Sequence, residues 1–229
     1  MRRGELALAA GYFAYFGAVG IFQPYWPAHL EDLGYSAATI GALMAAFSAV
    51  RVVGPLGSAW LADHLPDRRP LLVGSAALAT ASVVLLAQAE APWAALLALC
   101  AFSLFFNGIM PVYDAHTLDR LGADAHRYGW LRLWGSVGFV VTSYGVGLAI
   151  DRYGGGSIAG SLLALVAATT LLMLVLPAAP RRAARAATGG SFVAALQRPA
   201  VLAFLLVCFL QLASFGGYYS FYTLYLRSH

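Results

Sequence analysis

An acidic and a basic residue lie at equal distances on either side of a charged segment that interrupts a long apolar stretch of the sequence. Asp114 lies nine residues before Ala123, and Arg132 lies nine residues after it. A turn around 122–124 would place both side chains at the same depth, because each helical residue advances the chain by about 1.5 Å. Inside a membrane an ionisable group costs roughly 2.5–3.5 kcal/mol on insertion scales, so it normally has a partner and a role. The spacing therefore predicts an acid–base pair that meets a solute or a proton.

The two residue types indicate how such a pair would work. The guanidinium of Arg132 stays charged, and its planar fork fits a carboxylate, either that of Asp114 or that of a substrate. When a substrate carboxylate captures Arg132, Asp114 loses its partner in a poorly solvated place, which favours protonation of its carboxylate. Substrate binding would thereby be linked to proton uptake. A fixed structural ion pair between the two helices is the alternative interpretation.

The composition indicates an integral membrane protein. The 229 residues are 61% hydrophobic and 10% charged, whereas a soluble domain has about 25% charged residues. All fourteen basic residues are arginine, which excludes a Walker-type phosphate loop, a Schiff-base lysine and a retinal-binding lysine. The net charge of +4 follows the topology and gives no reason to expect a nucleic-acid partner.

Residues that could bind a metal or perform catalysis are not grouped for it in the sequence. Cys100 and Cys208 both lie inside apolar runs, as small buried hydrophobic residues do. The five histidines have no metal-ligand spacing, and His116, the one near the acid–base pair, is expected to be an interfacial residue. We find no paired-carboxylate or nucleophile motif. The sequence therefore predicts a protein that is not an enzyme and has no cofactor or metal.

Seven stretches are apolar enough and long enough to cross about 30 Å of hydrocarbon. Backbone polar groups in lipid must bond within their own segment, so these stretches are expected to be helices. Each has at most one charged residue, and Arg51 interrupts the second. The stretches cover residues 6–28, 36–61, 70–89, 92–113, 133–150, 154–178 and 199–226.

The arginines orient these helices. With the N-terminus inside, ten arginines flank the inner ends and only Arg152 and Arg227 flank the outer ends, as the positive-inside rule requires. We expect a multi-pass protein of the cell (inner) membrane with a cytoplasmic N-terminus. The basic, Ala- and Gly-rich stretch 180–199 predicts a cytoplasmic linker with a short surface helix. It would separate a six-helix bundle, 1–179, from one further helix, 200–229.

Polar side chains recur at spacings of three and four on four of the predicted helices. Lipid offers such side chains no partners, so these faces turn toward one another or toward a wet cavity; helix–helix hydrogen bonding without a cavity remains the alternative. Arg51 could bind a substrate, pair with an acid or extend toward the interface. The candidate substrate-binding and proton-coupling residues are Asp114, Arg132, Asn107, Tyr12, Tyr15, Gln23, Ser136, Gln211 and Tyr218.

Two stretches resemble the phenylpropionate permease group of the major facilitator superfamily. They are YGWLRLWGSVGF at 128–139 and the opening helix with GYFAYF at 11–16 and GIFQPYW at 20–26. The resemblance covers the whole chain and implies an all-α integral membrane fold, a six-helix half-bundle plus a seventh transmembrane helix. In the related lactose permease branch, an acid late in helix four and an arginine early in helix five form a substrate-linked pair. Asp114 and Arg132 occupy the matching positions.

The superfamily's cytoplasmic signature between helices two and three is partly present. Asp63, Arg68 and Arg69 match it, whereas Ala59 and Pro66 stand where glycines are usual. The glycine–proline signature of many antiporters is absent from the fifth predicted helix, which has no proline. Within this family the resemblance therefore implies symport rather than antiport.

The resemblance implies a secondary active transporter that works by alternating access, with proton-coupled symport of a small organic solute such as an aromatic acid. A sugar or nucleoside permease of the same fold, a channel, and a non-transporting membrane fragment or scaffold are the alternatives. Six helices form only one wall of such a cavity. We therefore expect a truncated chain whose partners are the bilayer, a small-molecule substrate, protons, and a missing C-terminal half or a second chain.

Overall fold

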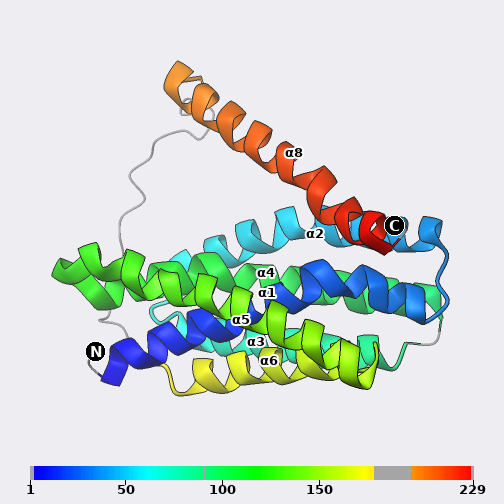
Figure 1. Ribbon diagram of the computed structural model, residues 1–229. Helices are drawn as coiled ribbons and strands as arrows, with labels where there is room; N and C mark the ends of the chain where they lie inside the picture. Colours follow the sequence, from blue (N-terminus) through cyan, green and yellow to red (C-terminus); the bar gives the residue numbers. More distant parts are fainter. Residues whose placement is uncertain (1–2, 90, 178–196, 228–229) are drawn as a thin grey trace. The chain divides into compact units, whose positions relative to one another are not determined.

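The structure, a computed structural model, describes residues 3–89, 91–177 and 197–227, which are helical over most of their length (Figure 1). The chain divides into two compact units, Met1–Arg181 and Arg182–His229. In its described part the first unit contains α1 (Arg3–Asp32), α2 (Ala37–His64), α3 (Arg69–Ala87), α4 (Pro92–Leu121), the 3-10 helix η1 (Gly122–Arg127), α5 (Tyr128–Tyr153) and α6 (Ser157–Leu174). The second unit contains α8 (Pro199–Arg227).

Five helical segments in the described ranges are long and apolar enough to cross a membrane. Four of them correspond to α1, α2, α3 and α6, and the fifth, Pro92–Tyr153, includes α4, η1 and α5. The all-helical membrane fold predicted from the sequence is thus confirmed. In α8 the apolar helix found is the shorter Pro199–Gln211, so the count of six transmembrane helices plus a seventh stays a prediction.

The charged break is a helical turn, as its sequence predicts. Gly122 ends α4 with a φ of 52°, a left-handed conformation that costs glycine little because it has no Cβ. η1 follows, and α4 and α5 meet it at the same end of the first unit (Figure 1). The domain assignment stays a prediction, and the surface helix expected in the linker lies outside the described residues.

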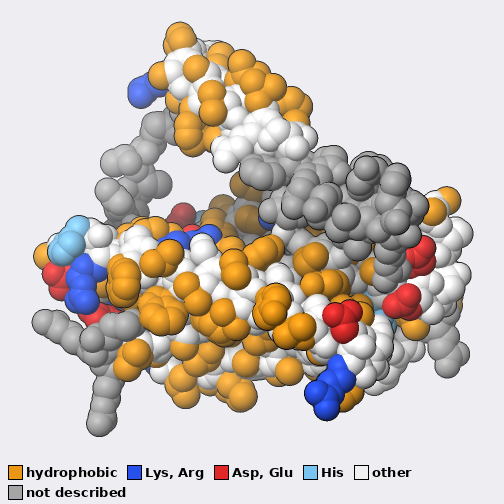
Figure 2. All heavy atoms as spheres, viewed as in Figure 1, with side chains coloured by type: hydrophobic (Ala, Val, Ile, Leu, Met, Phe, Trp, Pro, Cys, Tyr) orange, Lys and Arg blue, Asp and Glu red, His pale blue; other side chains and the backbone are white. Residues whose placement is uncertain are grey.

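The first unit is organised around α1 and α4. α1 packs along α5 and α6, α4 packs along α2 and α3, and α3 also contacts α6. The largest fully buried side chains include Trp26, Tyr12, Tyr113 and Phe102, so these two helices bring the aromatic side chains into the interior. Hydrophobic side chains also cover much of the visible face of this unit, and most charged ones gather toward its ends (Figure 2). That distribution suits a bundle surrounded by lipid.

α1 and α5 cross closely where glycines remove the side chains. A Cβ on Gly138 would lie 2.3 Å from the Phe13 carbonyl oxygen, and a Cβ on Gly20 would lie 2.6 Å from the Phe139 carbonyl oxygen. Two hydroxyls of α5 use this proximity. Thr142 donates to the Gly17 carbonyl at 2.8 Å, and Ser143 donates to the Gly20 carbonyl at 2.7 Å. Small residues and interhelical hydrogen bonds of this kind hold membrane helices together.

Replacing Gly138 with alanine is expected to separate α1 from α5. The new methyl group would overlap the Phe13 backbone, so we expect a loss of about 1–3 kcal/mol, typical of overpacking. Gly145→Ala, on the same helix, is the matched control because nothing lies within 4 Å of its added Cβ. Alanine also favours helix over glycine by about 0.5–1 kcal/mol. Thermal unfolding in detergent should show a lower Tm for Gly138→Ala and no decrease for Gly145→Ala; equal Tm values would contradict this packing.

Candidate solute-binding site

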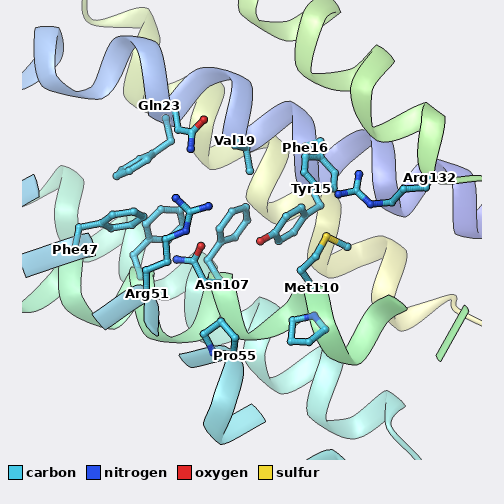
Figure 3. A pocket seen from close by; sticks show the side chains of 14 residues that line it. Tyr15, Phe16, Val19, Gln23, Phe47, Arg51, Pro55, Asn107, Met110 and Arg132 are labelled. Carbon is cyan, nitrogen blue, oxygen red and sulfur yellow. The ribbon is translucent and has the colours of Figure 1, made fainter. Parts of the chain in front are cut away.

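A cavity of about 320 Å³ lies in the first unit, where side chains of α1, α2, α4 and α5 converge (Figure 3). This volume is near the lower end of the range for small-molecule sites. Two arginines, two amide side chains and a tyrosine are set among aromatic and aliphatic groups. The lining residues are Tyr15, Phe16, Val19, Phe22, Gln23, Phe47, Arg51, Pro55, Phe102, Phe106, Asn107, Met110, Pro111 and Arg132.

Aromatic rings form a continuous row along this cavity. Tyr15 stacks on Phe106 with ring centroids 4.4 Å apart, and Phe106 stacks on Phe102 at 4.9 Å. Phe22 continues the row, 5.2 Å from Phe102 and 4.7 Å from Phe47. Aromatic pairs attract one another at such separations, so the row is a preformed apolar surface. A flat aromatic solute could add to it by the same interaction.

Arg132 is held at the cavity by aromatic rings. Its guanidinium carbon lies 3.8 Å from the centroid of Phe16 and 5.6 Å from that of Tyr12. Both distances are within the range of a cation–π interaction, which stabilises a guanidinium without using its N–H donors. The fork of donors therefore stays available for a carboxylate.

Asp114 and this arginine both contact Tyr12 and do not pair with each other directly. The Tyr12 hydroxyl donates a 2.7 Å hydrogen bond to Asp114 Oδ1, and Tyr12 is fully buried. In the described part of the chain no ion pair within 4.0 Å joins Asp114 to Arg132. The two side chains therefore do not form a direct ion pair here, and their role as a substrate-linked pair stays a prediction. Tyr12 from α1 reaches both groups, with its hydroxyl on the acid and its ring beside the arginine.

Residues 6–229 match the family described as MFS_1 like family. The chain belongs to this family. A protein of Escherichia coli (strain K12) described as "Probable 3-phenylpropionic acid transporter" is 34% identical over 230 residues, which are 96% of this chain and 59% of that protein. The match confirms the predicted resemblance to the phenylpropionate permease group of the major facilitator superfamily.

Two solved structures share the fold of this MFS_1 like chain. Nucleoside transporter NupG aligns with a TM-score of 0.79 at 19% identity, over 96% of this chain and 57% of that one. The POT family transporter PepTSo aligns with a TM-score of 0.68 at 14% identity, over 94% of this chain and 49% of that one. The chain thus spans about half to three fifths of the length of these transporters.

The structure brings several predicted site residues of this MFS_1 like protein together. Tyr15, Gln23, Asn107 and Arg132 line the cavity. Asn107 donates to the Ser103 carbonyl at 2.9 Å, which orients its amide. Tyr12 and Asp114 are next to Arg132 but are not part of the lining.

Of the other predicted residues, Ser136 is not among the residues that line the cavity, and Gln211 and Tyr218 belong to the second unit. Ser136 is exposed on α5, one turn beyond Arg132. Gln211 is exposed on α8 in the second unit. The side chain of Tyr218 lies outside the described ones. Their roles in binding stay predictions.

The sequence analysis did not name Phe102 and Phe106 as site residues, and it left the role of Arg51 open. Phe102, Phe106 and Met110 line the cavity with Asn107, and their spacing of four residues puts them on one face of α4. That periodicity was a usable signal. Arg51 gave no such signal, because a single arginine in an apolar helix is equally consistent with a residue that extends to the membrane interface.

The residues of the predicted signature loop tie three helices together at one end of the unit. Arg68 pairs with Asp119 at the end of α4, and lies 3.9 Å from Asp63, whose side chain is 71% exposed. Arg69 donates to the Leu174 carbonyl at the end of α6 at 3.1 Å. The exposed contact with Asp63 contributes little, so the partly buried Arg68–Asp119 pair is the stronger link.

We expect the Tyr12 hydroxyl to act on stability through Asp114. Tyr12→Phe keeps the ring beside Arg132 but removes a hydrogen bond to a partly buried carboxylate, so a loss of about 1–3 kcal/mol is expected. Asp114→Asn weakens the same contact. Thermal unfolding of both single variants and the double variant should give effects that are clearly less than additive. Additive losses would contradict a shared interaction. Tyr25→Phe serves as the control, because the Tyr25 hydroxyl donates to the Ser143 carbonyl instead and its loss should add to that of Asp114→Asn.

Proposed function

We propose that this chain forms the substrate-binding wall of a secondary transporter that carries a small aromatic carboxylate together with a proton. The observation that supports this most is the guanidinium of Arg132, which stacks on Phe16 at a cavity lined by a row of aromatic rings. The relative at 34% identity, described as a probable 3-phenylpropionic acid transporter, supports the same substrate class.

The residues define how an aromatic acid would bind. Its carboxylate would accept two parallel hydrogen bonds from the Arg132 fork, which is the strongest geometry for that pair. Its ring would lie against the row that begins at Tyr15 and Phe106, with edge or offset contacts. Apart from the two arginines, only Gln23, Asn107 and the Tyr15 hydroxyl offer hydrogen bonds to the uncharged hydroxyls of a sugar or nucleoside. The apolar lining favours the aromatic acid.

Proton coupling would follow from the contacts of Asp114. The groups near its carboxylate are Tyr12, which donates to it, Tyr128, whose ring is 6.4 Å from that of Tyr12, and the Arg132 guanidinium beyond the Tyr12 ring. When a substrate carboxylate occupies the Arg132 fork, Asp114 would accept the coupled proton, and it would release that proton when the substrate leaves.

Alternating access requires a second helical bundle that moves against this one. We propose that this second wall belongs to the same transporter, further along the polypeptide or in a second chain, and that α8 is its first helix. The relatives are consistent with this arrangement because they are longer than this chain. The transporter would lie in the cell (inner) membrane with the N-terminus of this chain in the cytoplasm, as the arginine distribution predicts.

Replacing Arg132 tests the substrate-binding role. With the protein expressed from its native reading frame, Arg132→Gln should raise the KM for uptake of radiolabelled 3-phenylpropionate by about tenfold or more, the effect of losing one charge-assisted contact. The KM of Arg132→Lys should lie between those of the wild type and Arg132→Gln, because lysine keeps the charge but lacks the planar fork of donors. Arg152→Gln is the matched control, being the same change on the same helix away from the cavity. An unchanged KM in Arg132→Gln would rule out the proposed carboxylate contact.

Replacing Asp114 tests the proton coupling. Asp114→Asn should abolish accumulation of 3-phenylpropionate driven by a pH gradient in proteoliposomes, because the amide cannot take up and release the proton. Exchange of labelled for unlabelled substrate, which needs no net proton movement, should persist. Asp151→Asn, at the far end of α5, provides the control. Gradient-driven uptake that survives in Asp114→Asn would reject the coupling role.

A further inference from the structure

A second guanidinium lies in the same cavity as Arg132. Arg51 projects into it from α2, and Figure 3 shows the two arginines at opposite ends with aromatic side chains between them. The Gln23 and Asn107 side chains lie at the Arg51 end in the same view. The cavity therefore has a polar group of donors at each end and an apolar middle.

The separation of the two ends can be judged along α1. Phe16 is in contact with Arg132, and Gln23 lies near Arg51 (Figure 3). These two residues are seven positions apart on one helix, which corresponds to about 10 Å along its axis. That span accommodates a substituted benzene ring with an ionised group at each end.

The residues that line the cavity supply no negative charge of their own, and Asp114 lies behind Tyr12 outside the lining. None of the residues that line it is acidic, and in the described part of the chain neither Arg51 nor Arg132 has a carboxylate within 4.0 Å. Two cations in one cavity repel each other and favour the entry of anions. One monocarboxylate would neutralise only one of the two.

We propose that Arg51, together with the Gln23 amide, forms a second anion-binding subsite, and that the preferred substrates are aromatic acids with a second anionic group at the opposite end of the ring. This proposal rests on the proposed function and specifies its substrate class. The first carboxylate binds Arg132, the ring lies along the row that includes Tyr15 and Phe106, and the second carboxylate binds Arg51. The alternative occupant of Arg51 is an acidic side chain from the second bundle.

Competition for uptake of labelled 3-phenylpropionate distinguishes these possibilities. The competitors are 3-(4-carboxyphenyl)propionate and, as a control for size, 3-(4-methylphenyl)propionate. In the wild-type transporter we expect the diacid to inhibit at a concentration about tenfold or more below that of the methyl compound, since one charge-assisted contact is added. Equal inhibition by the two compounds would overturn the proposal, and this comparison needs no variant that must fold.

The Arg51→Gln variant tests whether Arg51 causes the preference for the diacid. In this variant the diacid and 3-(4-methylphenyl)propionate should inhibit uptake at similar concentrations, so that the ratio of the two inhibitory concentrations falls to about one. An equal loss of both acids, in a variant that inserts into the membrane at the wild-type level, would overturn the proposal in favour of an acid from the second bundle. Failure of the proposed function would give a different result. The wild type would then take up no 3-phenylpropionate, or Arg132→Gln would take it up with the KM of the wild type.

Discussion

The contact of Arg132 with the rings of Phe16 and Tyr12 is the interaction on which the site depends. A guanidinium within a membrane bundle is expensive unless something replaces its hydration, and here aromatic faces do so while its N–H donors stay available. The contact exists because α1 and α5 approach closely at Gly20 and Gly138. Backbone packing between two helices thus determines where a positive charge can be kept.

The bundle treats its charges differently at its end and in its interior. At the end, Arg68 pairs with Asp119 and Arg127 pairs with Glu5, so that charges link neighbouring helices. In the interior, Arg132 is set on aromatic rings, and Asp114 accepts from a tyrosine hydroxyl. Paired charges suit a structural role, because breaking a pair is costly. Charges without an ionic partner suit a site where a solute supplies that partner.

Much of the fold could be predicted from the sequence, because lipid leaves few choices. Apolar stretches of the length found in α1 to α6 must be helices, since backbone groups have no other partners in hydrocarbon, and the break at 122–127 had to be a turn. The polar faces of α1 and α4 could also be predicted, because helical periodicity places Tyr15 and its neighbours on one face of α1, and Asn107 and its neighbours on one face of α4. These inferences need only the distances within one helix.

The sequence by itself determined the helices, the position of Asp114 and Arg132 on either side of one turn, and the family to which the chain belongs. Only the tertiary structure decided that Tyr12 stands between those two residues, that Arg51 shares the cavity with Arg132, and that Ser136 does not line it. The physical reason is that residue spacing fixes the angle of a side chain around its own helix axis. The rotation of that helix against its neighbours is set by the packing of all their faces together.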